Sequence, residues 1–230
     1  MEHSTFLSKK QLADYSENGF LVLPNFIQPE MVDKLRDEAK NIVADFDTES
    51  VSIFSTKSQE KKSDAYFLES GGKISCFFEE GAFDVSGTLT VDKSLAINKI
   101  GHALHDLNPQ FKEASYTEKL QRLMNDLGIS LPMIVQSQYI FKQPKIGGLV
   151  NPHMDAVFLY TQPVSCTGIW MAMEDASIQN GCLHAIPGSH KEYPLTKRFI
   201  RNDTISTSFD QLSEKDDVWD LDRLVPLEVK

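Results

Sequence analysis

A histidine and an aspartate separated by one position, in the segment Asn151-Pro152-His153-Met154-Asp155, have the clearest potential for chemistry. In an extended backbone, such side chains point to the same face, about 6.6 Å apart along the strand. His153 and Asp155 can therefore bind one metal ion from a single rigid segment. Two His and one carboxylate on Fe(II) leave open positions for a chelating co-substrate and O₂. A surface histidine beside a turn aspartate is the alternative, because this spacing is common.

The elements that must position this pair change character along the chain. Ser8 can cap a helix through Asn18 that Gly19 ends, and the apolar run Phe20–Leu23 predicts a buried strand. A second helix begins near Pro29, with apolar residues every three or four positions. This core-facing stripe is Met31, Val32, Leu35, Ala39, Ile42, Val43 and Phe46. Further helices are expected at about 94–107 and 116–127.

From Pro132 onward the pattern becomes short apolar runs separated by Pro, Gly and Asn, which is typical of strands. The runs are MIVQSQYIF (133–141), FLY (158–160), GIWMAME (168–174) and CLHAI (182–186). We therefore predict one α+β domain, residues 1–230. In it, a mostly helical layer (1–131) packs on a β core (132–230), a sandwich or jelly roll.

Composition restricts the classes of function. The 230 residues are enough for one domain with a sizeable core. The formal net charge of −10 argues against a nucleic-acid partner, because phosphate binding requires clustered Lys and Arg. Cys76, Cys166 and Cys182 form no CxxC motif, which indicates a reducing compartment. Without a signal peptide or an apolar run of about 18 residues, we expect a cytoplasmic protein with no membrane span.

Five segments in order resemble the phytanoyl-CoA dioxygenase family over essentially the whole chain. They are ENGFLVLPNF (17–26), INKIGHALH (97–105), QSQYIFKQP (136–144), GGLVNPHMDAVFLYT (147–161) and GIWMAMEDASIQNGCLHAIPGSHK (168–191). The resemblance implies a double-stranded β-helix (jelly-roll) core with flanking helices. It also implies a non-haem Fe(II)/2-oxoglutarate-dependent dioxygenase, which converts 2-oxoglutarate and O₂ to succinate and CO₂ while hydroxylating a substrate. Ascorbate would support the iron.

The resemblance implies that His153 and Asp155 are iron ligands. It places four residues at the 2-oxoglutarate site: Lys99, Gln138, Met154 and Trp170. Gln138 departs from the family, where close relatives carry Met. A lysine suits a dianionic keto acid, and an aromatic wall excludes water. The alternatives are a solvated lysine in a helix-like segment for Lys99 and core packing for Trp170. For Gln138, which shares a strand face with Gln136, the alternative to a polar pocket is a solvent-facing sheet surface.

In the family, a later strand carries a second His ligand, followed by an Arg that binds the far carboxylate of 2-oxoglutarate. No segment after Asp155 matches that motif. We interpret His184 and His190 as non-ligands, because the PGSH sequence precedes the distal His in relatives. We therefore expect the core to miss its last strands, and expect weak metal affinity and exposed strand edges.

These expectations leave two main hypotheses. The first is the dioxygenase, although we expect little or no turnover from these 230 residues. The alternative is a catalytically inactive, truncated form that acts as a binding or regulatory protein. A zinc hydrolase is a weaker third, because no HExxH motif is present. The family name suggests an acyl-CoA or related lipid as the small-molecule substrate. The basic residues nearest to a cluster that could bind a CoA phosphate are Lys191, Lys197, Arg198 and Arg201. We interpret them more simply as part of a solvated loop.

Overall fold

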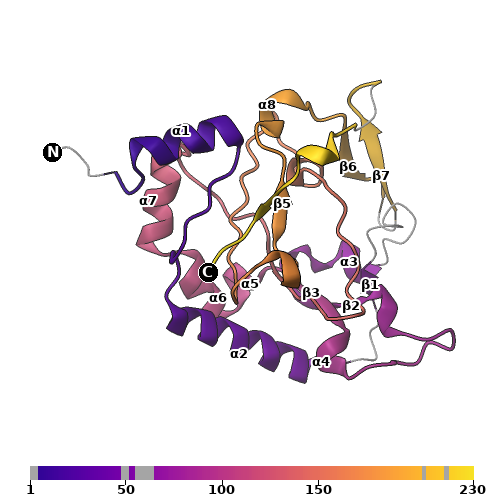
Figure 1. The fold of residues 1–230 in the computed structure, drawn as a ribbon. Helices are drawn as coiled ribbons and strands as arrows, with labels where there is room; N and C mark the ends of the chain where they lie inside the picture. Colours follow the sequence, from indigo (N-terminus) through magenta and orange to yellow (C-terminus); the bar gives the residue numbers. More distant parts are fainter. Residues whose placement is uncertain (1–4, 48–51, 55–64, 204–205, 215–217) are drawn as a thin grey trace.

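A computed structural model describes residues 5–47, 52–54, 65–203, 206–214 and 218–230 (Figure 1). The helices are α1 (Lys9–Asn18), α2 (Pro29–Asp45), α3 (Ala65–Leu68), α4 (Lys93–Ala96), α5 (Leu104–Leu107), α6 (Pro109–Ser115), α7 (Glu118–Asp126) and α8 (Ser189–Glu192). The strands are β1 (Ile53–Phe54), β2 (Ile74–Glu79), β3 (Ile97–His102), β4 (Ser137–Ile140), β5 (Leu183–Ala185), β6 (Lys197–Arg201), β7 (Thr207–Gln211) and β8 (Val225–Leu227). No helix in the described ranges is long and apolar enough to cross a membrane.

The first helix begins and ends where the sequence predicts, and the second begins where it predicts. Ser8 and Gln11 form a capping box at the start of α1, and Gly19 ends the helix with a left-handed backbone at φ 81°. Pro29 lies in the first turn of α2. The predicted stripe is confirmed in its centre, where Leu35, Ala39 and Val43 are buried.

The largest sheet has the strand order β1-β2-β3-β4, with β1 parallel to β2 and the other pairs antiparallel. One face packs on α2, which runs along the lower edge of Figure 1. The buried residues of this contact are Leu35, Ala39, Val43, Cys76, Phe78, Ile97 and Ile100. Three of the four strands thus come from the region that we expected to be mostly helical.

The prediction of one helix over residues 94–107 is wrong for the middle of that range. One helical turn, α4, leads into strand β3, and α5 follows. All but one residue of β3 are buried, so the strand lacks the alternation of polar and apolar residues that identifies a half-buried strand. The two buried isoleucines, Ile97 and Ile100, are three positions apart and imitate a helical stripe.

Three apolar runs that we predicted as strands are not strands. Residues 20–23 form an irregular segment, and Leu21 and Leu23 pack beside Leu120 and Leu123 of α7. Residues 158–160 follow a 3₁₀ turn, and 168–174 have no regular structure. The runs at 133–141 and 182–186 are confirmed in part, as β4 and β5.

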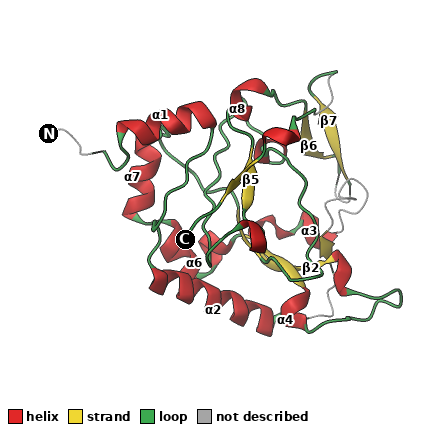
Figure 2. Cartoon of the chain, in the orientation of Figure 1, coloured by secondary structure: helices red, strands yellow, loops and turns green. Residues whose placement is uncertain are grey.

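Two small antiparallel sheets complete the described β structure, β5 with β8 and the hairpin β6–β7. The chain therefore mixes helices and strands, as predicted, and its sheets are mainly antiparallel. Figure 2 shows the loops that connect these elements. In the described residues the strands form three separate sheets, and none closes into a barrel.

Candidate metal centre

His153 and Asp155 converge as their spacing predicts. Nε2 of His153 lies 3.4 Å from Oδ1 of Asp155. The residue between them, Met154, has an extended backbone (φ −110°, ψ 125°), which turns its two neighbours to the same side. The surrounding segment is a loop rather than a paired strand, and a 3₁₀ turn begins at Asp155.

A backbone carbonyl selects the tautomer of His153. Nδ1 lies 2.8 Å from the carbonyl oxygen of Asn151, which can only accept, so Nδ1–H donates. The lone pair of the neutral ring is then on Nε2, the atom beside Asp155. A ligating histidine is usually oriented in this way, through the nitrogen that does not bind the metal.

The two side chains also shift each other's ionisation. When the ring is protonated, Nε2–H donates to Asp155, and this hydrogen bond raises the pKa of His153 and lowers the pKa of Asp155. Asp155 therefore stays ionised, as a metal ligand must. The proton that His153 retains more firmly competes with a metal ion for Nε2.

Gly168 leaves room at the other oxygen of the carboxylate. A Cβ at this position would lie 3.3 Å from Oδ2 of Asp155, which is tighter than an ordinary contact. No sequence pattern singles out Gly168, apart from its place two positions before Trp170.

Gly168→Ala should therefore weaken metal binding by roughly 10-fold, the lower end of the range for a disturbed outer-shell contact, because the methyl group displaces Asp155. The midpoint of thermal unfolding should change little, because Gly168 is exposed and has no positive φ. Titration calorimetry with Co(II) measures the affinity. Gly71→Ala is the matched control, since a Cβ there meets no atom within 4 Å. Equal affinities in both variants would contradict a role for Gly168.

An imidazole nitrogen and a carboxylate oxygen suit a borderline divalent cation such as Fe(II). They supply two ligands. Within the described ranges, no group of three or more His, Cys, Asp or Glu side chains is placed to hold a metal ion. Cys166 is not a good third ligand, because burial and then the charge of Asp155 raise the pKa of its thiol.

Lys99 is a buried residue of β3, so the prediction of a helix-like segment around it is wrong. Its side chain is 5% exposed, and Nζ lies 5.3 Å from the ring centre of Phe77 and 6.0 Å from that of Phe67. This burial lowers the pKa of Lys99 to about 7.

Gln138 lies on the same sheet face as Lys99. The register pairs Lys99 with Ile140 and Gly101 with Gln138, so the two side chains are diagonal neighbours on adjacent strands. Gln138 is exposed, and its amide nitrogen donates to the side chain of Gln136 at 3.0 Å. The pairing favours a polar surface beside Lys99.

A neutral histidine lies near Lys99. The hydroxyl of Ser70 donates to the carbonyl of Phe67 at 2.6 Å, so it accepts from Nδ1–H of His102 at 2.9 Å. Burial and then the charge of Lys99 lower the pKa of His102 to about 4. His102 therefore adds no positive charge beside Lys99 near neutral pH.

Five of the predicted site residues thus lie in two segments: His153, Met154 and Asp155 in one loop, and Lys99 and Gln138 on the sheet. The β6–β7 hairpin contacts neighbours of both segments. Phe199 packs on Phe158 beside His153, and Arg201 donates to the carbonyl of Leu68 at 3.4 Å, next to Phe67. Trp170 is 46% exposed, which argues against the alternative of core packing.

Comparison with known proteins decides the family. The sequence model of the phytanoyl-CoA dioxygenase (PhyH) family matches residues 15–230. The chain belongs to the PhyH family.

Curated members of the PhyH family are similar over most of the chain. A phytanoyl-CoA dioxygenase of Arabidopsis thaliana is 49% identical over 207 residues, covering 90% of this chain and 72% of that protein. The phytanoyl-CoA dioxygenase domain-containing protein 1 homolog of Dictyostelium discoideum is 46% identical over 227 residues, 97% of this chain and 80% of that protein. Phytanoyl-CoA dioxygenase domain-containing protein 1 of Mus musculus is 43% identical over 232 residues, 97% of this chain and 79% of that protein.

Two further histidines of this PhyH chain lie elsewhere. Nε2 of His190 donates to the carbonyl of Ser16 at 3.2 Å, and the N–H of Gly188 donates to that of Asn18 at 3.0 Å. A Cβ at Gly19 would lie 2.3 Å from the His190 ring, so glycine is required there by this contact as well as by its φ. His184 is exposed in β5.

Three of the four basic residues that we considered for a phosphate lie on strand β6, not in a solvated loop. Arg198 pairs with Asp210 at 2.8 Å, and its guanidinium is 5.2 Å from the ring centre of Tyr160.

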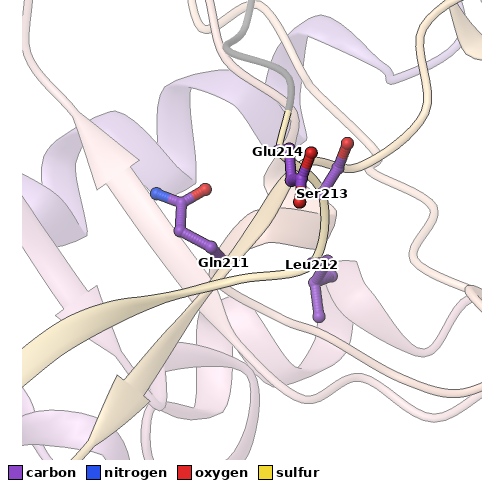
Figure 3. A pocket seen from close by; sticks show the side chains of 4 residues that line it. All are labelled: Gln211, Leu212, Ser213 and Glu214. Atoms are coloured by element: carbon purple, nitrogen blue, oxygen red, sulfur yellow. The ribbon is translucent and has the colours of Figure 1, made fainter.

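Figure 3 shows an open surface hollow at the end of β7, lined by Gln211, Leu212, Ser213 and Glu214. None of the predicted site residues lines this hollow.

Proposed function

We propose that this chain is a non-haem Fe(II)- and 2-oxoglutarate-dependent dioxygenase that hydroxylates a small molecule. The observation that carries the proposal is the pair of donors in the 153–155 loop, with the Nε2 lone pair of His153 3.4 Å from the Asp155 carboxylate. Membership of the PhyH family supports the choice of iron over other divalent metals. Bound iron would supply the chemistry that activates O₂.

The residues of the chain then have distinct tasks. His153 and Asp155 hold the metal, and the Asn151 carbonyl keeps the imidazole in the ligating tautomer. Lys99 meets a carboxylate of 2-oxoglutarate, and its buried position strengthens that attraction. Met154, Gln138 and Trp170 line the same site, where Trp170 excludes water. The antiparallel sheets are parts of a jelly-roll core in this proposal.

One observation favours a second candidate, a PhyH protein that binds ligands without turnover. The described residues supply two metal ligands where the dioxygenase mechanism uses three. Such a chain would act as a binding or regulatory protein. For either candidate we infer a small organic ligand, and the relatives' name, phytanoyl-CoA dioxygenase, suggests an acyl-CoA or related lipid.

Release of succinate tests the proposal directly. Purified chain supplied with Fe(II), 2-oxoglutarate, ascorbate and O₂ should form succinate above the level of the same mixture without iron. Mass spectrometry measures succinate, and calorimetry measures binding of metal and 2-oxoglutarate. Binding of both without succinate would favour the second candidate. Absence of metal binding would rule out the dioxygenase.

A further inference from the structure

Three phenylalanines, Phe158, Phe199 and Phe209, form an aromatic cluster beside the candidate metal ligands. The ring of Phe158 meets His153 edge to face, with centroids 6.0 Å apart and planes at 81°. Phe158 in turn lies 5.7 Å from Phe199 and 6.0 Å from Phe209, which are 5.3 Å from each other. Sequence reasoning selected none of the three.

Phe158 is fixed to both members of the ligand pair. Its backbone N–H donates to the carbonyl of Asp155 at 2.9 Å, as does that of Leu159. These bonds close the 3₁₀ turn that begins at Asp155. The ring of Phe158 reaches back to His153. Phe158 therefore contacts both the backbone of Asp155 and the side chain of His153.

The β6–β7 hairpin holds Phe158 from the other side. Phe199 and Phe209 are direct cross-strand partners, so their rings stand on one face of the hairpin. The neighbouring pair, Arg198 and Asp210, forms an ion pair at 2.8 Å, and Arg198 also lies over Tyr160. The hairpin thus contacts the 155–160 segment through aromatic rings and a guanidinium.

We propose that Phe158, braced by Phe199 and Phe209, is a positioning residue that holds the His153 imidazole with Nε2 toward Asp155. His153 needs such a contact. Its side chain is 43% exposed, and among the described residues the ring has two polar contacts, with Asp155 and with the Asn151 carbonyl. An edge-to-face aromatic neighbour restricts the rotation that one hydrogen bond leaves free. This inference rests on the proposed metal-binding function.

Phe158→Leu is the test, because leucine keeps an apolar side chain and removes the ring. We expect Co(II) affinity to fall by about 10-fold, as for loss of an outer-shell partner. In the metal-free protein, nitrogen NMR of the imidazole should change from a single Nδ1–H tautomer of His153 to a mixture. Phe158→Tyr should keep both properties of the wild type.

Phe6→Leu is the matched control. Phe6 is 38% exposed against 37% for Phe158, and it forms a similar edge-to-face pair with Phe26 at 5.8 Å. This control should leave the tautomer and metal affinity unchanged. If Phe158→Leu does not fold, Phe199→Leu replaces it. We expect that variant to show a smaller loss of Co(II) affinity and a smaller change in the His153 tautomer.

Wild-type affinity and a single His153 tautomer in folded Phe158→Leu would overturn the inference. Failure of the proposed function has a different signature, a wild-type protein that binds no divalent metal. The tautomer of metal-free His153 would still decide the role of Phe158 in that case.

Discussion

His153→Ala should abolish measurable Co(II) binding by the chain. The loss should exceed the roughly 10–100-fold that removal of an outer-shell partner costs, because the variant keeps only one of the two described donors. Titration calorimetry or the visible absorption of bound Co(II) measures the change. His184→Ala is the control, since His184 is an exposed histidine of β5. Equal affinity of the two variants would place the metal elsewhere.

The wild-type affinity should also depend on pH in a definite direction. The pKa of His153 is raised by its hydrogen bond to Asp155, so the ring becomes protonated at a higher pH than an isolated histidine. Metal binding requires the neutral ring. Affinity should therefore fall as the pH decreases through the raised pKa of His153 and be constant well above it. A flat profile across this range would argue against His153 as a ligand.

Lys99→Met should stabilise the fold and remove 2-oxoglutarate binding. Burial lowers the pKa of Lys99 from its ordinary value of 10.5 to about 7, so the folded state disfavours the charged form. Between these values the unfolded chain binds more protons than the folded one. Wild-type stability should therefore rise with pH through this window, by up to about 1.4 kcal/mol per pH unit. Below pH 7 the full penalty remains.

Methionine removes the ionisable group at similar length, so Lys99→Met should be more stable than wild type at pH 7. The difference should shrink as the pH rises toward 10.5. Urea unfolding at several pH values measures it, and Lys112→Met, at an exposed position of α6, is the control. Calorimetry with 2-oxoglutarate tests the binding part. A less stable Lys99→Met at pH 7 would show that the charge of Lys99 is well compensated in the fold. Undiminished 2-oxoglutarate binding would remove Lys99 from that site.

Local signals in the sequence predicted the helices better than the strands. The capping box at Ser8 and the proline at Pro29 are decided within a few residues, and both helices form as expected. Strand β3 is buried on both faces, so its composition does not separate strand from helix. The apolar run 20–23 packs against α7 instead of pairing, a choice that depends on distant residues.

The same distinction applies to the site. The spacing of His153 and Asp155 predicted their convergence, because one extended residue between them is sufficient. The burial of Lys99 depends on the pairing of β3 with β2, in which Lys99 lies opposite Phe77. No local sequence pattern reveals this pairing. Gly168 reaches the site only through the path of a long loop.

The contact between α1 and α8 bears on how the chain is made. Ser16 and His190 are 174 positions apart, so the intervening residues must be synthesised before α1 can meet this partner. Long-range contacts of this kind form late and slow folding. During translation α1 therefore depends on its capping box and on α7, whose Asp126 accepts from the N–H of Leu7.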